Sequence, residues 1–415
     1  MLQKHDLKSA IPINGGDLGG PEPSMLPAWF LALGTFAIGT EGFMIAPLLP
    51  TISADLGMSL SATAMLVVVF TLVLALSSPI ATVITGGLRR RDTLLLAMML
   101  FTGGNLIAAF APGFGTLIFA RILMAVAAGL YAPNANALAG MIVPAEKRGR
   151  ALAIVSGGMT IAIALGLPLG SIIGHAFGWR STFLMVAATG AAAIIGILAG
   201  VGRNAGAHMV IASLDERIGV IRQAPVLKLL SVTLFWSMGA YTAYPYIAPY
   251  LSQTLGLADR GIAATVTLWG VFAALGVFTG GALNDRFGSL KVAKLSLIAL
   301  ALSFAALAVA TVLPDIGAVL LALLAVAGWG FSVWSFFPAQ MARLIVAGGQ
   351  SHASVALSLN TSTMYLGFSI GSAIGAGIIA IGNVWMIGAA AAVMELVALA
   401  LDEIWKRRQS RRERR

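Results

Sequence analysis

Cysteine is absent from this 415-residue chain, histidine occurs only 4 times, and charged residues make up 10% of the sequence. The lack of cysteine excludes disulfides, thiolate metal sites and cysteine nucleophiles. No histidine falls clearly within an apolar run, and no serine–histidine or paired-aspartate cluster is present. We therefore expect no catalytic residue, no bound metal and no cofactor.

Long apolar runs dominate the sequence instead. Hydrophobic residues make up 59% of the chain, which is too many to hide in a water-soluble core, so lipid must be their solvent. The runs are about 18–25 residues long, which at ~1.5 Å per residue matches a hydrocarbon layer of ~30 Å. This pattern predicts an all-α membrane protein with twelve spanning helices. We place them at 27–50, 60–88, 93–111, 116–140, 149–173, 181–201, 227–251, 261–283, 291–313, 316–345, 353–381 and 384–404.

A polar linker at 202–226 divides six predicted spans from six others. Short echoes in equivalent spans, such as Gly170–Gly174 and Gly371–Gly375, support a duplicated unit. Repeats in the same order are typical of two halves related by an axis along the membrane normal. We therefore predict two pseudo-symmetric six-helix bundles, 27–201 and 227–404.

Basic residues set the predicted orientation. All lysines and arginines except Arg121, Arg180 and Arg260 fall on one side of the spans, which predicts that both termini are cytoplasmic. They form short clusters between apolar runs, so the net charge of +10 does not predict a nucleic-acid partner. The polar segment 1–26 is expected to be a flexible tail. The basic segment 405–415 either anchors the last helix or binds anionic lipid.

The loop after the eighth span carries Gly281, Asp285, Arg286 and Gly288. It resembles the signature loop of the major facilitator superfamily, G-x-x-x-D-R-x-G-R-K. The resemblance implies that the loop gates the cytoplasmic side, with Gly281 allowing two helices to approach and Asp285 capping a neighbouring helix N-terminus. An ordinary basic loop is the alternative. The corresponding segment 87–92 inverts the order of acidic and basic residues, so Arg89 to Arg91 either contribute to a gate or serve only as an orientation signal.

The fifth span carries Gly166, Pro168 and Gly170, and its exit reads G-W-R-S-T-F over 178–183. This stretch is similar to the antiporter motif of drug:proton exporters, in the form of the branch that exports sugars, arabinose, chloramphenicol and purine nucleosides. The segment 39–50 also resembles that branch. We expect the two glycines and the proline to form a tight, bent interface between the halves. A purely structural kink is the alternative.

Two charges lie inside predicted spans, where an unpaired charge is costly. Glu41 lies midway along the first span and Arg121 about five residues into the fourth. Arg121 resembles the arginine of the family's R-x-x-x-G motif, with Ala125 in place of its glycine. We predict that Glu41 and Arg121 carry proton coupling. Snorkelling of Arg121 to the headgroups and a structural hydrogen bond of Glu41 are the alternatives. Glu395 in the last span is expected at the periphery without a role.

Aromatic residues gather in the seventh and tenth spans, which line the cavity with the first and fourth in the family's fold. Rings with polar tips suit a moderately apolar, hydroxylated or aromatic solute. Asn136 shares a stripe of small and polar residues with Arg121, and Asn360 either contacts the solute or joins helices. The predicted cavity residues are Phe43, Asn136, Trp236, Tyr241, Tyr244, Trp334, Phe337 and Asn360.

The function expected from these features is proton-coupled efflux of a small organic solute such as a sugar, nucleoside or drug. The two halves would rock around a midplane cavity, driven by the proton gradient. The resemblance implies a monomer in a bacterial cytoplasmic membrane. A proton-coupled importer or a uniporter shares the fold and stays open as an alternative, and a membrane-embedded enzyme is the least favoured reading.

Overall fold

The computed structural model describes residues 25–203, 205 and 214–413, and within them the chain is helical without a strand. The predicted tail 1–26 lies almost wholly outside these residues. Eleven helical segments in the described part of the chain are long and apolar enough to cross a membrane. The long helices are α1 (Leu26–Asp55), α3 (Met65–Ile84), α4 (Arg90–Ala109), α5 (Phe114–Ala139), α6 (Arg148–Ile161), α8 (Trp179–Gly200), α10 (Ala224–Ala243), α12 (Asp259–Phe287), α13 (Ser289–Ala310), α14 (Asp315–Ala380) and α15 (Met386–Glu413).

Short elements complete several of these spans. The helix α2 (Leu60–Thr63) precedes α3, while α11 (Ile247–Leu255) continues α10 through a short 3₁₀ turn, η4 (Tyr244–Tyr246). A π-helical turn, η3 (Ala162–Gly166), joins α6 to α7 (Leu167–Phe177). The linker contains one helix, α9 (Leu214–Ile221). The helix α15 is not among the eleven segments long and apolar enough to cross a membrane, two of which come from α14, and it packs against α10 and α13.

Two glycines with positive φ reverse the chain between spans. Gly288 lies between α12 and α13 with φ of 82°, and Gly349 interrupts α14 with φ of 69°. A side chain would strain the backbone in this region, so glycine is the residue that fits both turns. The break at Gly349 divides α14 into two spans, Ile316–Gly349 and His352–Ala380.

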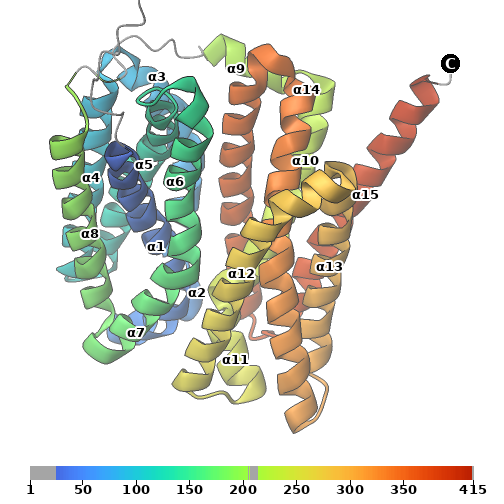
Figure 1. Cartoon of the computed structure of the whole chain (residues 1–415). Coiled ribbons are helices and arrows are strands. Elements are labelled where there is room, and N and C mark those ends of the chain that lie inside the picture. The colour runs from blue at the N-terminus through green and yellow to red at the C-terminus, as the bar shows by residue number, and fades with distance from the viewer. Residues whose placement is uncertain (1–24, 204, 206–213, 414–415) are drawn as a thin grey trace, which may run out of the picture.

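The helices form two groups, one from α1 to α8 and the other from α10 to α15 (Figure 1). The groups meet where α1 contacts α11 and η4, where α7 and η3 contact α12, and where α2 and α3 contact α14. Figure 1 shows α12 slanting from the second group toward α7. The contacts between the groups therefore gather toward the end of the molecule that carries α7 and α11.

Small residues set the packing of α6, η3 and α7 on α1. A Cβ added at Gly166 would overlap the Thr40 hydroxyl, and one at Gly170 would lie 2.8 Å from Met44 Cβ. These glycines therefore pack within their own half, which corrects the prediction that they form the interface between halves. The contact with the other half is made by the Ile163 carbonyl, which would lie 2.8 Å from a Cβ at Gly270 of α12. Pro168 is the second residue of α7, which follows directly on the π-helical turn.

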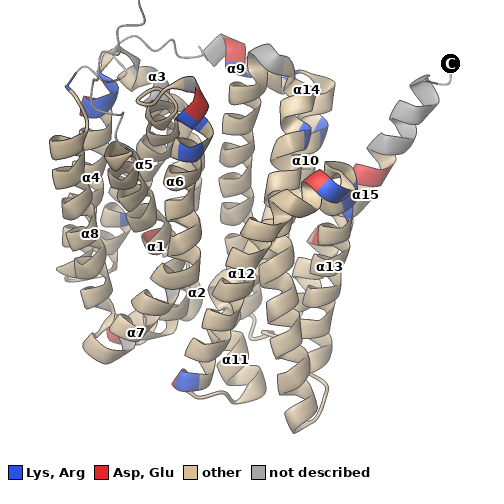
Figure 2. Cartoon of the chain, viewed as in Figure 1, with Lys and Arg blue, Asp and Glu red and all other residues tan. Residues whose placement is uncertain are grey.

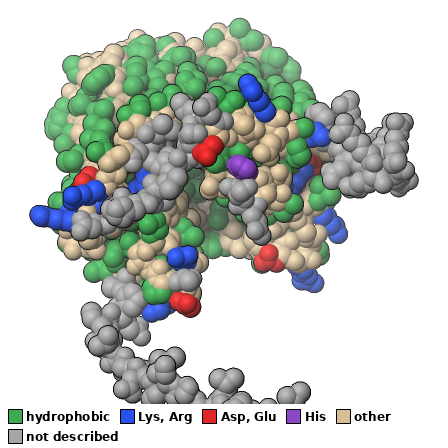
Figure 3. All heavy atoms as spheres, turned by 90° about the horizontal axis from the view of Figure 1, so that it is seen from above, with side chains coloured by type: hydrophobic (Ala, Val, Ile, Leu, Met, Phe, Trp, Pro, Cys, Tyr) green, Lys and Arg blue, Asp and Glu red, His purple; other side chains and the backbone are tan. Residues whose placement is uncertain are grey.

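Charged side chains gather at the two ends of the molecule and are denser at the end that carries α9 (Figure 2). At the opposite end Arg180 donates to Asp55 at 2.6 Å. Seen from the α9 end, the surface is hollowed between the two groups of helices, with hydrophobic side chains deep in the recess (Figure 3). This conformation is therefore joined at the α7–α11 end and parted at the α9 end.

Candidate functional site

Glu41 of α1 and Arg121 of α5 form a buried ion pair between two helices of the first group. Both side chains are 0% exposed. Arg121 also donates through Nε to the Leu66 carbonyl at 3.1 Å, and its guanidinium lies over the Phe70 ring, 4.0 Å from the centroid. The Arg121 side chain is fully buried, so it does not snorkel to the surface, and the snorkelling alternative is wrong for this conformation.

The pair is only partly satisfied by hydrogen bonds. One oxygen of Glu41, Oε2, and one nitrogen of Arg121, Nη2, have no partner within the described part of the chain. Burying two charges is costly, and their attraction offsets this cost fully only when the remaining polar atoms are also bonded. The arrangement therefore leaves one acceptor and one donor in the membrane interior that a proton or a solute can engage.

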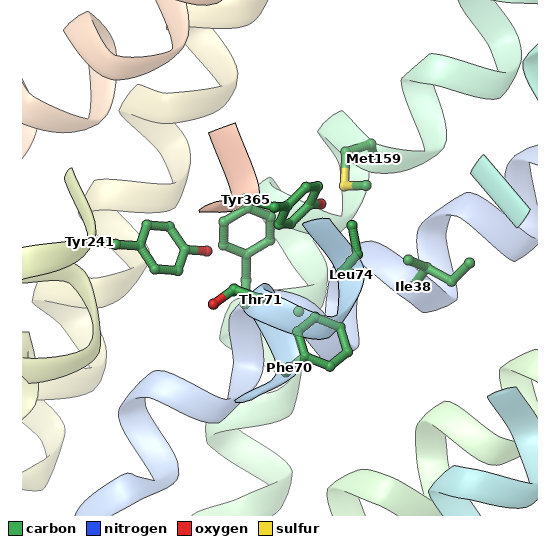
Figure 4. Close-up of a pocket in the computed structure, with 10 residues that line it drawn as sticks. Ile38, Phe70, Thr71, Leu74, Met159, Tyr241 and Tyr365 are labelled. Atoms are coloured by element: carbon green, nitrogen blue, oxygen red, sulfur yellow. The ribbon is translucent and has the colours of Figure 1, made fainter. Parts of the chain in front are cut away.

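A cavity, called here the central cavity, lies next to this pair, because Phe70, the ring under the Arg121 guanidinium, belongs to its lining. Its volume is about 10 Å³, which is room for about one water molecule. Tyr241 reaches into it from α10 of the second group, opposite Phe70 and Thr71 of α3 (Figure 4). The cavity must expand to hold an organic solute. Its lining is Ile38, Gly39, Gly42, Phe43, Phe70, Thr71, Leu74, Met159, Tyr241 and Tyr365.

A second, aromatic cavity continues from the first, with which it shares Phe43 and Tyr241. The Tyr244 hydroxyl donates to the Phe43 carbonyl at 2.9 Å, which connects the two groups of helices. Tyr241 stacks on Phe368 with ring centroids 3.6 Å apart. We use the name aromatic cavity for the space lined by Phe43, Trp236, Ala240, Tyr241, Tyr244, Trp269, Trp329, Val333, Trp334 and Phe368.

Five predicted cavity residues line this space, namely Phe43, Trp236, Tyr241, Tyr244 and Trp334. The sequence prediction missed several others because they lie outside the four spans implied by the family resemblance. Trp269 comes from α12 and Phe368 from the second span of α14, which also contributes Tyr365 to the central cavity. An aromatic ring in an otherwise small and aliphatic stretch was the signal for Trp269.

Three other predicted cavity residues lie outside both linings. Asn136 is half-buried and donates to the carbonyl of Ala132 at 3.1 Å. Asn360 accepts a hydrogen bond from the Thr233 hydroxyl at 2.7 Å. It therefore joins α14 to α10, which was the alternative to a contact with the solute. Phe337 borders the aromatic cavity, with its ring centroid 6.0 Å from that of Trp334. None of the three belongs to the lining of the central cavity or of the aromatic cavity in this conformation.

The signature loop does not make the predicted gating contacts in this conformation. Asp285 and Arg286 are exposed at the end of α12, and the N-terminus of α13 receives no side-chain cap. A Cβ at Gly281 would meet nothing within 4 Å. The close approach predicted for Gly281 is instead made by Gly280, where a Cβ would lie 3.0 Å from Pro338.

Glu395 of α15 is buried, which corrects its expected place at the periphery. Its side chain is 0% exposed, and neither carboxyl oxygen has a hydrogen-bond partner in the described residues. The carboxyl group lies against α10 at Gly239, where an added Cβ would be 2.6 Å from Oε1. The absence of a side chain at Gly239 therefore makes the room that Glu395 occupies.

Comparison with known proteins agrees with this architecture. The model of the Major Facilitator Superfamily matches residues 31–372 and, in a second alignment, 229–415. The chain is 30% identical to the uncharacterized MFS-type transporter YbcL of Bacillus subtilis, over 90% of this chain and 94% of that protein. It is 28% identical to the inner membrane transport protein YdhP of Escherichia coli, over 86% and 89% of the two chains.

A third relative carries a more specific description. The chain is 30% identical to a chloramphenicol resistance protein of Streptomyces lividans, over 63% of this chain and 67% of that protein. The family match covers most of the chain, including both ends of the Glu41–Arg121 pair and the residues of the aromatic cavity. The chain therefore belongs to the Major Facilitator Superfamily and is a membrane transporter.

Proposed function

We propose that this transporter exports a small organic solute in exchange for protons by alternating access. The Glu41–Arg121 pair carries the proposal, because it places an ionisable carboxyl group inside the membrane beside the central cavity. Proton binding at Glu41 would weaken its attraction to Arg121, and that change would favour one conformation over the other. Solute release and proton binding would then alternate.

The lining of the aromatic cavity supports a solute that is moderately apolar and carries a ring. Its aromatic rings offer a large apolar contact area to a solute, and its lining contains few polar side chains. The chloramphenicol resistance protein among the relatives supports a drug of that kind as a candidate. The similarity to an inner membrane transport protein of Escherichia coli supports a place in a bacterial cytoplasmic membrane.

The charge distribution supports an orientation. Among the described residues, the lysines and arginines other than Arg121, Arg180 and Arg260 lie toward the side of the spans that carries α9. We propose that this side is cytoplasmic and that the conformation described here is open to the cytoplasm. We further propose that the working unit is a monomer, since the cavity is built within one chain.

The test uses protein reconstituted in vesicles with an imposed pH gradient. Chloramphenicol, a purine nucleoside and arabinose are assayed for movement against the direction of proton flow. Glu41→Gln is expected to abolish gradient-driven movement while retaining binding. The matched control is Glu403→Gln, because Glu403 pairs with Lys294 at 2.5 Å near the surface, far from the cavity lining.

Three outcomes would contradict the proposal. Undiminished gradient-driven efflux in Glu41→Gln would remove Glu41 from the coupling mechanism. Movement of solute and protons in the same direction by the unmodified protein would instead identify a proton-coupled importer, and transport unaffected by the gradient would identify a uniporter.

A further inference from the structure

Two hydroxyl groups of the α10–α15 group donate hydrogen bonds to main-chain carbonyls of the α1–α8 group. The Tyr244 hydroxyl, from η4, donates to the Phe43 carbonyl of α1 at 2.9 Å. The Ser369 hydroxyl, from the second span of α14, donates to the Val68 carbonyl of α3 at 3.0 Å. Both donor side chains are buried. Each bond joins the two groups directly, and we call these two hydrogen bonds the latches.

The latches lie toward the α7–α11 end of the molecule, where the two groups meet. Tyr244 belongs to η4, which leads directly into α11. Val68 is in the first turn of α3, next to α2, and both of these helices contact α14. Separation of the groups at this end breaks both hydrogen bonds. The latches therefore stabilise the conformation described above, in which the α7–α11 end is joined and the α9 end is parted.

The acceptor of each latch lies two residues from a contact of the buried ion pair. Phe43 follows Glu41 on α1, and Glu41 binds Arg121. Val68 follows Leu66 on α3, and the Leu66 carbonyl accepts from Arg121 Nε at 3.1 Å. One short segment of α1 and one of α3 therefore carry both the contacts of the ion pair and the acceptors of the latches.

Arg121 connects these two segments from a third helix. It binds α1 through the Glu41 carboxylate and α3 through the Leu66 carbonyl, so it fixes the position of both acceptor segments relative to α5. Loss of the charge on Glu41 leaves a buried guanidinium without its counter-ion, which forces a rearrangement of its surroundings. Hydrogen bonds weaken steeply when their angle departs from the preferred geometry. A shift of α1 or α3 is therefore felt at the latches.

Buried tyrosines outside the latches bond within one group of helices. Tyr131 of α5 donates to the Leu31 carbonyl of α1 at 3.0 Å. Tyr250 of α11 donates to the Leu307 carbonyl of α13 at 2.6 Å. Such bonds hold a bundle together in every conformation of the transporter. The latches differ from them because they exist only while the two groups are joined at the α7–α11 end.

We propose that Tyr244 and Ser369 are positioning residues that connect the charge state of Glu41 to the α7–α11 end. They hold that end closed while the pair of Glu41 with Arg121 is intact, and neutralisation of Glu41 weakens their hold. This inference rests on the proposed function and deepens it, because it names the residues through which proton binding changes the access of the cavity.

Distances between two spin labels on the full chain in lipid nanodiscs, without solute, test the latches. The chain has no cysteine, so Ala176→Cys of α7 and Val312→Cys after α13 supply the labelling sites. Both positions are exposed, and they lie on different groups at the α7–α11 end. Tyr244→Phe and Ser369→Ala are each expected to raise the ratio of long to short distances about 3- to 10-fold.

Matched control variants remove a hydroxyl that bonds within one group. Tyr250→Phe is the control for Tyr244→Phe. Ser335→Ala is the control for Ser369→Ala, because the Ser335 hydroxyl donates to the Phe331 carbonyl of its own helix at 2.8 Å. Both controls are expected to leave the distances unchanged. Thermal unfolding of every variant checks that the chain is folded.

A double-variant comparison tests the connection to the ion pair. Glu41→Gln is expected to lengthen the distances when both latches are present. In the variant that already carries Tyr244→Phe and Ser369→Ala, the same substitution is expected to change the ratio less than twofold, because the residues that connect Glu41 to this end are missing.

Several results would overturn the inference. These are unchanged distances in the variant that lacks both latches, equal lengthening in the control variants, and an effect of Glu41→Gln that is absent with the latches or the same size without them. The proposed function fails separately. If the distances change as expected but a pH gradient drives no efflux, the latches stand and proton-coupled export does not.

Discussion

Arg121 is buried in the protein interior and forms an ion pair with Glu41, while its guanidinium also contacts the Phe70 ring and donates to the Leu66 carbonyl. Removal of one member of a buried pair leaves the other charge uncompensated, at a cost of about 3–5 kcal/mol. We expect Arg121→Met to lower the Tm strongly. Thermal unfolding in detergent measures this loss.

The double variant Glu41→Gln with Arg121→Met provides the control for this prediction. It removes both charges, so it is expected to regain a substantial part of the stability that Arg121→Met loses. Equal Tm values for the single and double variants would show that the pair contributes through packing rather than through charge.

Glu395 and Gly239 form a second testable contact at the residue scale. A methyl group at Gly239 would lie 2.6 Å from Glu395 Oε1 and 3.0 Å from the Ala391 carbonyl. Overpacking of this kind costs about 1–3 kcal/mol, so Gly239→Ala is expected to lower the free energy of unfolding. Adding Glu395→Ala should restore part of the loss, and an increase of the loss in that double variant would contradict the assigned contact.

The difference between Glu41 and Glu395 shows what the sequence can predict at this scale. Depth in the membrane follows from position along a span, so both Glu41 and Arg121 were recognisable as intramembrane charges. The side of a helix on which Glu395 lies was not recognisable, because lipid and protein interior are both apolar and apolar periodicity does not separate them. For the same reason Asn136 and Asn360 were placed on the cavity although they bond within their own bundles.

At the scale of elements, glycine positions decide how closely α6 approaches α1. Thr35 donates to the Val155 carbonyl at 2.7 Å across this contact. A Cβ at Gly158 would overlap the Ala32 carbonyl and lie 2.6 Å from Thr35 Oγ1. Gly158→Ala is therefore expected to separate the helices and to lower stability by about 1–3 kcal/mol.

The adjacent residue supplies a matched control for this substitution. A Cβ at Gly157 would meet nothing within 4 Å. Since alanine is favoured over glycine in a helix by up to about 1 kcal/mol, Gly157→Ala is expected to keep or raise the Tm. Similar losses in both variants would mean that helix geometry, rather than the contact between α1 and α6, limits stability.

Element positions were largely predictable because each apolar run must be long enough to cross the membrane. The local backbone geometry within a span was less predictable from the sequence. The predicted span 60–88 is built from α2, α3 and a short 3₁₀ turn, and the predicted fifth span contains the π-helical turn 162–166. These irregularities depend on contacts with other helices, such as Ile163 against Gly270, which hydropathy along one segment does not record.

At the scale of the whole molecule, the two groups of helices touch toward one end and part toward the other. Gly270 sits at this contact, because its missing side chain lets α12 approach the Ile163 carbonyl. Gly270→Ala is expected to disfavour the joined end and so to favour closure of the recess at the α9 end. A bias of ~1 kcal/mol would change the ratio of the two conformations about fivefold.

A single cysteine can report this change because the chain contains none of its own. Ser156 is exposed on α6, one turn from Met159 of the central cavity, which places it along the recess. Ser156→Cys should react with a maleimide in the otherwise unchanged protein and more slowly when combined with Gly270→Ala. Gly377→Ala is the control, since a Cβ there meets nothing within 4 Å. Faster labelling with Gly270→Ala than with the control would contradict a rocking motion in which the two ends open in turn.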